Sequence, residues 1–265
     1  LKEGLDPRNG WIDVYPSSDK ESGAFSASVY GRHPYVKMNY QDSLDDLSTL
    51  AHEYGHALHS HLAMAHQAYW DHRYVPFLAE IASTCNEALL SEYLVRQADS
   101  DAAKAGILAA DLESIRTTIS RQTLFSEFER RVHGDVEGGR PITAALLDET
   151  YRDLVARYYG AGFTVGENDG MEWAYIPHFY YQYSDYSYAT GLSCGLAIAE
   201  NVKTNGQPAV DGYLAMLQGG CAEPPLDLLR KAGVDLTRPD AIEAALARFD
   251  RTIDELAELL DVELE

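Results

Sequence analysis

The segment "LAHEYGHALHSHLA", residues 50–63, places histidines and one glutamate within a run of leucine and alanine. His52 and His56 are four residues apart, so on a helix both imidazoles lie on one face and can bind a single metal ion. Glu53 lies on the adjoining face, where its carboxylate can take a proton from a water molecule. Zinc lowers the pKa of such a water toward about 7. The spacing therefore predicts a zinc centre with His52 and His56 as ligands and Glu53 as general base.

His59 shares the stripe of His52, seven residues further along the chain. HExxH is a short pattern that also occurs by chance in unrelated helices. Here, however, the surroundings are mostly apolar, and buried His and Glu side chains need partners to offset their desolvation. We expect His59, one further turn from the two converging histidines, to support the site or to pack beside it without binding the metal.

A catalytic zinc site usually has three protein ligands and one water molecule. The HExxHxxGxxH class supplies a third histidine, but His59 and Leu62 occupy its glycine and histidine positions here. The following segment, "FLAEIASTCNEALLSEY", offers Glu80, Glu87 and Glu92. Glu80 and Glu87 are seven residues apart and share a face, so spacing leaves both open. Whichever one is not a ligand is expected to orient a ligand histidine.

Composition limits the classes of partner and compartment. The chain has 265 residues, 46% of them hydrophobic, which is enough to bury a sizeable core. Its formal net charge of -21 repels nucleic acid and anionic membranes, so neither is expected as a partner. The three cysteines are far apart and predict no disulfide framework, and no apolar run approaches the roughly 18 residues of a membrane span. We expect a reducing compartment and leave the oligomeric state open.

The elements that must position these residues follow from periodicity. Alternation in "GWIDVYP" and "GAFSASVYG", followed by "HPYVKMNY", predicts a small antiparallel β-sheet within residues 10–40. Ser43 or Asp42 can cap the helix that carries the histidines. From 43 to 265 the pattern is mostly helical, with no internal repeat and no linker. We therefore predict one mainly α domain over 1–265 with a small sheet near its start.

Five segments together resemble a known family, in the same order along the chain: "GWIDVY", "SGAFSASVYGRHPYVKMNY", "LAHEYGHALHS", "FLAEIASTCNEALL" and "IPHFYYQYSDYSYATG". They resemble the catalytic half of oligoendopeptidase F, which belongs with thimet oligopeptidase and neurolysin among the zinc peptidases. The resemblance covers nearly the whole chain and implies a zincin-type helical catalytic domain. It also implies that Glu80 is the third zinc ligand and that Glu87 partners a ligand histidine.

The same resemblance implies a substrate class. Members of that family cut short, unstructured peptides, which enter a channel between two mostly helical halves, and they are usually cytoplasmic. Their N-terminal half, which forms the other wall of the channel, has no counterpart in these residues. We therefore expect either a fragment or a shortened relative with a more open cleft.

A tyrosine-rich segment, "HFYYQYSDYSYATG", begins at residue 178. Cleavage of a peptide bond by water creates an oxyanion, which hydroxyl or imidazole donors stabilise. By resemblance to the family, His178 and Tyr186 are expected to supply such donors, followed by Tyr188, with Tyr183 as a further contact to substrate. Ser184 stands where many relatives have a tyrosine. For Tyr180 and Tyr181 we predict aromatic packing in the core.

The run "GAFSASVYG" is expected to form an edge strand beside the cleft. Through Ser26, Ala27 and Ser28 it can pair with an extended peptide by main-chain hydrogen bonds, which do not depend on the peptide's sequence. The leading hypothesis is thus an endopeptidase of broad specificity.

Two alternatives remain. A carboxypeptidase or dipeptidyl carboxypeptidase needs a group that binds the free C-terminus, for which Arg32 or Arg73 is available. A non-catalytic, zinc-containing peptide-binding protein needs no general base, and Glu53 argues against it because structural zinc sites usually have four protein ligands.

Overall fold

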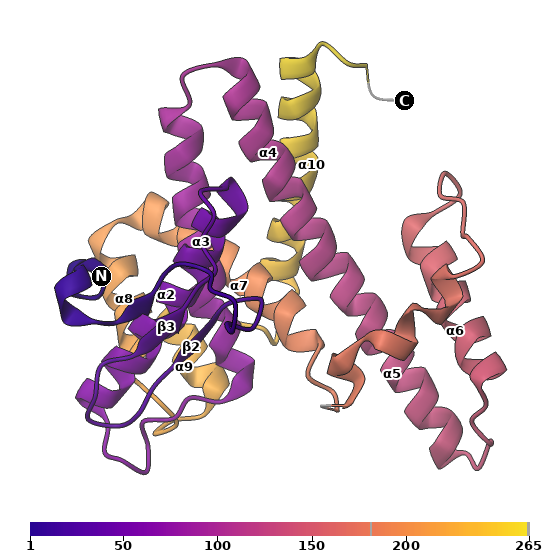
Figure 1. Cartoon of the computed structure of the whole chain (residues 1–265), viewed down its shortest axis with the longest axis horizontal. Helices are drawn as coiled ribbons and strands as arrows, with labels where there is room; N and C mark the ends of the chain where they lie inside the picture. Colours follow the sequence, from indigo (N-terminus) through magenta and orange to yellow (C-terminus); the bar gives the residue numbers. More distant parts are fainter. Residues whose placement is uncertain (181, 264–265) are drawn as a thin grey trace. The chain divides into compact units, whose positions relative to one another are not determined.

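The computed structural model describes residues 1–180 and 182–263, and the chain forms two compact units (Figure 1). The first unit comprises Leu1–Glu113 and Thr190–Glu265, and the second comprises Ser114–Ala189. The predicted mainly α class is confirmed. In chain order the main elements are β1 (Ile12–Asp13), β2 (Phe25–Ala27), β3 (Tyr35–Lys37), α2 (Leu44–His66), α3 (Pro76–Gln97), α4 (Asp101–Ile115), α5 (Gln122–Glu137), α6 (Ala144–Tyr159), α7 (Tyr186–Asn205), α8 (Gln207–Leu217), α9 (Pro225–Lys231) and α10 (Asp240–Leu260).

Short helical turns complete the described part of the chain. They are α1 (Lys2–Leu5) and the 3-10 turns η1 (Pro7–Asn9), η3 (Asp169–Tyr175) and η4 (Pro177–Tyr180), together with a π-helical turn η2 (Arg116–Arg121) between α4 and α5. Helix α4, the turn η2 and helix α5 follow one another directly along the chain. Among the described residues, no helix combines the length and apolar composition that crossing a bilayer requires.

Helix α2 begins at a reciprocal cap. The Ser43 hydroxyl accepts from the Asp46 N–H at 3.0 Å, and the Asp46 carboxylate accepts from the Ser43 N–H at 3.1 Å. Each bond satisfies a backbone donor that the first helical turn leaves without a partner. Of the two predicted caps, Ser43 is therefore the one used. On the inner side of the helix, Tyr54 and Ala57 pack against Val36 of β3 in a common core.

Helices α2 and α3 approach so closely that only glycine fits at their crossing. A β-carbon on Gly55 of α2 would stand 2.4 Å from Cα of Ser83 on α3. Helix α7 approaches α3 from elsewhere in the same unit, where a β-carbon on Gly191 would stand 2.6 Å from Cβ of Glu80. The α3 segment that carries Glu80 is thus held by backbone contacts with two neighbouring helices.

The small sheet has the strand order β1–β3–β2. Strand β2 runs antiparallel to β3, with Ser26 opposite Val36, and β1 runs parallel to β3, with Ile12 opposite Val36. The prediction of a small sheet near the N-terminus is confirmed, but the antiparallel arrangement is wrong for β1. The long connection over residues 14–34 allows the parallel pairing, which a tight turn cannot make. Strand β2 lies at one edge, as the sequence predicts.

The second unit packs α5 against α6. Glu127 of α5 accepts hydrogen bonds from Arg131 at 2.8 Å, from Arg157 of α6 at 2.8 and 2.9 Å, and from Tyr158 of α6 at 3.0 Å. One carboxylate thereby ties the two helices together. Their shared core consists of Leu124, Phe125, Phe128, Tyr151, Leu154, Val155 and Ile176.

Candidate active site

Three side chains from α2 and α3 converge in the first unit. The Nε2 atoms of His52 and His56 lie 3.2 Å apart. Oε2 of Glu80 lies 3.3 Å from Nε2 of His52 and 3.6 Å from Nε2 of His56. One ligand atom from each residue thus lies within 4.8 Å of the others. Two imidazole nitrogens and one carboxylate oxygen aimed at a common point form a donor set that suits a divalent cation such as zinc.

Glu87 lies on the opposite side of the His52 ring. Its Oε1 is 2.5 Å from Nδ1 of His52, and its Oε2 accepts from the Ser48 hydroxyl at 3.1 Å. The two glutamates, which spacing could not distinguish, therefore contact different nitrogens of one imidazole. An acid on Nδ1 fixes the ring and leaves Nε2 free to bind a metal.

Burial and the neighbouring charges shift the pKa values of both histidines in opposite directions. Burial alone lowers the pKa of His52, but hydrogen bonds and charges from Glu80 and Glu87 outweigh it and raise the pKa to about 10. Burial lowers the pKa of His56, which favours the neutral imidazole that binds a metal.

Glu53 is 7% exposed, and its Oε2 has no hydrogen-bond partner among the residues described. Burial raises the pKa of this carboxyl, the charge of His52 lowers it, and the charges of Glu80 and Glu87 raise it again. A buried carboxylate oxygen without a partner is costly and is a common feature of functional sites. Glu53 therefore lies beside the His52–His56–Glu80 group with an atom available to accept a proton.

His59 packs and does not join this group. Its ring is fully buried and stacks on Tyr74 with ring centroids 3.6 Å apart. Within the described part of the chain neither ring nitrogen has a hydrogen-bond partner, and burial, followed by the charge of His56, lowers its pKa to about 3. Seven residues correspond to about 10 Å along the helix axis, so His59 lies about two turns from His52. Its packing role is the one observed.

Two serines beside the ligands were not predicted from the sequence. Ser48 bonds Glu87, and the Ser83 hydroxyl donates to Oε2 of Glu80 at 3.1 Å. Ser48 precedes His52 by one helical turn and Ser83 follows Glu80 by three residues. Helical spacing from the ligands is therefore the signal that finds both of them.

The tyrosine-rich segment belongs to the second unit up to residue 189. The rings of His178 and Tyr188 meet edge to face, with centroids 5.8 Å apart. Tyr186 and Tyr183 are 45% and 49% exposed. Tyr180 is 80% exposed, so its predicted core packing is wrong, because η4 turns this ring outward. Tyr181 lies outside the described residues.

Asp185 is a buried group in this segment that no sequence pattern singled out. Its carboxyl is fully buried, and neither oxygen has a hydrogen-bond partner among the residues described. Burial raises its pKa to about 6, opposed by the charge of His178 and supported by that of Glu129. An aspartate at the start of a helix is usually an exposed N-cap, so local sequence does not predict the burial of Asp185, which depends on tertiary packing.

The predicted substrate contacts fall on and beside β2. Ser26 and Ala27 lie in the strand, Ser28 follows its end, and α2 packs against the strand. The two arginines proposed for binding a free C-terminus, Arg32 and Arg73, are both exposed.

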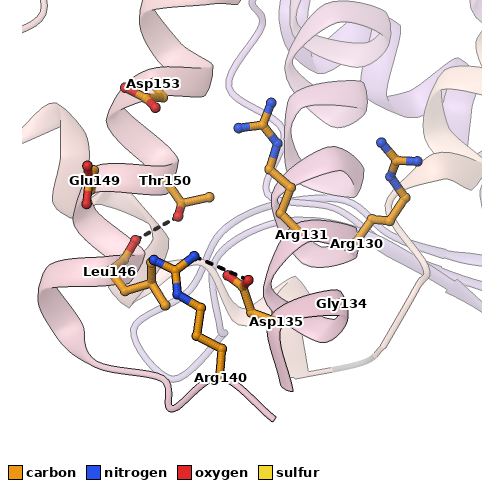
Figure 2. A pocket seen from close by; sticks show the side chains of 9 residues that line it. All are labelled: Arg130, Arg131, Gly134, Asp135, Arg140, Leu146, Glu149, Thr150 and Asp153. Carbon is orange, nitrogen blue, oxygen red and sulfur yellow. Dashed lines mark hydrogen bonds and ion pairs between the residues drawn. The ribbon is translucent and has the colours of Figure 1, made fainter. Parts of the chain in front are cut away.

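A separate hollow of about 510 Å³ lies in the second unit, between α5 and α6 (Figure 2). Its charged lining consists of three arginines and three acids, and Figure 2 shows Arg140 paired with Asp135. Arg131 is already paired with Glu127. None of the residues predicted to act in catalysis lines this hollow; the lining consists of Arg130, Arg131, Gly134, Asp135, Arg140, Leu146, Glu149, Thr150 and Asp153.

Comparison with known proteins gives one consistent result. The family model for peptidase family M3 matches residues 5–248. Oligopeptidase PepF of Bacillus subtilis (strain 168) is 45% identical over 260 residues, which cover 98% of this chain and 38% of that protein. The chromosomal oligoendopeptidase F of Lactococcus lactis subsp. cremoris is 38% identical, covering 98% of this chain and 43% of the relative.

A solved structure agrees. The crystal structure of oligoendopeptidase-F from Enterococcus faecium superposes with a TM-score of 0.70 at 38% identity, covering 82% of this chain and 40% of that one. The chain thus spans less than half the length of these relatives.

Proposed function

The chain belongs to peptidase family M3, and from this we propose that it acts as a zinc-dependent oligopeptidase that cleaves internal bonds of short, unstructured peptides. One observation carries the proposal. Two imidazoles and a carboxylate from the next helix converge beside Glu53, a buried acid with an oxygen that has no partner among the described residues. A site of this kind has both a place for a metal and a group that accepts a proton.

The metal ligands in this proposal are His52, His56 and Glu80. Three protein ligands leave a position open for water, as catalytic zinc sites do, whereas structural sites usually use four. This difference disfavours a purely structural zinc. When bound, zinc acidifies a water molecule and polarises the scissile carbonyl. Glu87 holds Nδ1 of His52 and is itself held by Ser48, so the ligand ring cannot rotate freely.

Glu53 performs both proton transfers. Its carboxylate accepts a proton as water oxygen bonds to the peptide carbonyl carbon, and then delivers that proton to the amide nitrogen as the C–N bond breaks. Burial suits it to this cycle, because it raises the pKa of the carboxyl and so makes Glu53 a better proton acceptor. His178 and Tyr186, with Tyr188 as the next candidate, supply donors to the oxyanion that forms between the two transfers.

Peptide recognition in this proposal uses main-chain contacts. An extended substrate lies along the edge of β2, at Ser26, Ala27 and Ser28, and Tyr183 adds a side-chain contact. Main-chain pairing ignores side-chain identity and therefore gives broad specificity. The net charge of -21 favours neutral and cationic peptides. We further propose a cytoplasmic location, in keeping with free Cys85, Cys194 and Cys221.

The test is Glu53→Gln in the zinc-loaded chain. We expect zinc content equal to that of the parent and a fall in kcat of about 100- to 10,000-fold on an internally quenched peptide. Asp45→Asn is the matched control, since this exposed acid lies in the first turn of the same helix and its loss should leave kcat unchanged. Cleavage by Glu53→Gln at the parental rate would remove the assigned base.

Product analysis separates the alternatives. A peptide with an amidated C-terminus should be cut at internal bonds as fast as its free-acid form. Loss of cleavage on amidation would instead support a carboxypeptidase. Zinc binding without cleavage of any member of a mixed peptide library would support the peptide-binding protein.

A further inference from the structure

The backbone is strained just before α7. Gln182 and Tyr183 have φ angles of 51° and 50°, two consecutive left-handed residues that are not glycine. In this conformation the β-carbon crowds the following carbonyl, so non-glycine residues seldom adopt it. Such a pair persists only where the surroundings hold it, and strained backbone of this kind concentrates at functional sites.

Two side chains of α5 hold this turn. Glu129 is 4% exposed, and its Oε1 accepts from the Tyr183 N–H at 2.6 Å. His133, one helical turn further on, places its ring against the Tyr183 ring with centroids 4.7 Å apart. Nε2 of His133 lies 3.9 Å from Oε1 of Glu129. Glu129 thus binds the backbone of Tyr183, and His133 contacts its ring.

The turn leads directly into the first turn of α7. The Ser187 hydroxyl and N–H both donate to the Ser184 carbonyl, at 2.6 and 3.1 Å, and the Tyr188 N–H donates to the Asp185 carbonyl at 3.2 Å. Residues 184 and 185 therefore fix the rotation of the helix start. That rotation sets the directions in which Tyr186 and Tyr188 leave the helix.

We propose that Glu129 and His133 are positioning residues, which clamp Tyr183 and so fix the directions of Tyr186 and Tyr188. The inference rests on the proposed function, in which these tyrosines assist His178. Neither clamp residue contacts a reacting atom. They act on catalysis by holding the hydroxyl groups of Tyr186 and Tyr188 in the orientation that the reaction needs. A donor misplaced by about 1 Å can cost about 100-fold in rate.

Glutamine is the informative replacement for Glu129. Its amide oxygen can still accept from the Tyr183 N–H, and it removes the negative charge near buried Asp185, whose pKa that charge helps to raise. Alanine removes the acceptor and leaves the Tyr183 N–H without this hydrogen bond. Comparing the two variants separates loss of the hydrogen bond from loss of charge.

The experiment compares Glu129→Gln, Glu129→Ala and Glu127→Gln in the zinc-loaded chain, at a temperature where circular dichroism shows all three folded. Glu127 lies on the same helix but bonds α6, away from the strained turn. For Glu129→Ala we expect kcat to fall about 10- to 100-fold with KM and zinc content within about twofold of the parent. Glu129→Gln should stay within about threefold of parental kcat, and Glu127→Gln should not change it.

Hydrogen exchange tests the clamp independently of catalysis. In the parent the amide of Tyr183 should be protected, in Glu129→Ala it should exchange at least about 10-fold faster, and in Glu129→Gln it should stay protected. Parental kcat in Glu129→Ala, or equal losses in the alanine and glutamine variants, would overturn the proposal. An inactive parent would count against the proposed function alone, since the exchange measurement would still decide whether the clamp exists.

Discussion

A β-carbon on Gly55 would stand 2.4 Å from Cα of Ser83, so α2 and α3 can meet as they do only because one helix lacks a side chain at the crossing. The blocking atoms are backbone atoms of α3 and cannot move aside as a flexible side chain would. This contact sets how far the imidazoles of α2 stand from the carboxylate of Glu80.

Gly55→Ala should therefore weaken both folding and metal binding. We expect a loss of at least about 2 kcal/mol in the free energy of unfolding, because the two helices must separate. Zinc affinity, measured by competition with a chelating dye, should fall at least about 10-fold. Gly106→Ala in α4 is the control, since among the described residues nothing beyond its own helix lies within 4 Å of its β-carbon position. Its free energy of unfolding should rise by up to about 1 kcal/mol. Unchanged zinc affinity in Gly55→Ala would show that the crossing does not set the ligand geometry.

The two glutamates around His52 should differ sharply in metal titrations. Glu87→Ala removes a partner of the ligand ring and should cost about 10- to 100-fold in zinc affinity. Glu80→Ala removes a carboxylate that faces both Nε2 atoms and should cost more than about 100-fold. The reverse order of affinities would make Glu87 the ligand.

Asp185 should make stability depend on pH. Its pKa is raised to about 6 from an ordinary value of 3.8, so the folded state binds the proton more tightly than the unfolded state does. Its contribution is therefore fully favourable below about pH 4 and is lost as the pH rises through about 6. Asparagine does not ionise, so the Asp185→Asn variant should not lose this stability as the pH rises.

Urea unfolding at a series of pH values measures the effect. Relative to the parent, Asp185→Asn should gain stability steadily between pH 4 and 7, by about 3 kcal/mol at most. A constant difference between the two proteins across this range would contradict the raised pKa.

Glu127 should matter for stability and not for turnover. Its carboxylate accepts from Arg131, Arg157 and Tyr158, and these hydrogen bonds outweigh burial and hold its pKa below the ordinary value. Glu127→Gln should cost about 1 to 2 kcal/mol, with the exposed Arg157 contributing least. Thermal unfolding with and without high salt checks this, because only the ionic part is screened. A loss of kcat at a temperature where the variant is folded would contradict the separation of the two roles.

Local sequence signals predicted much of the fold and part of the site. Near neighbours in the sequence determine the cap at Ser43, the helical period of residues 44–66 and the HEYGH spacing. In the structure α2 and its cap lie where these signals predict them. The choice between Glu80 and Glu87 lies beyond such signals, because both share a face and only the packing of α3 against α2 separates them.

Long-range contacts account for what the sequence did not predict. The parallel pairing of β1 with β3 joins residues more than twenty positions apart, so strand alternation carries no information about it. The burial of Asp185 and the exposure of Tyr180 likewise depend on which neighbours the tertiary fold supplies. The strained turn at 182–183 has no glycine to mark it, and the side chains that hold it, Glu129 and His133, lie on another helix.

The contact between Gly191 and Cβ of Glu80 also has a kinetic consequence. With its main chain enclosed by neighbouring helices and its carboxylate bonded by Ser83, Glu80 has little room to swing away by itself. Release of a bound cation then requires a transient separation of α3 from its neighbouring helices. The rate at which an excess of chelator removes the metal ion should therefore report how often this separation occurs.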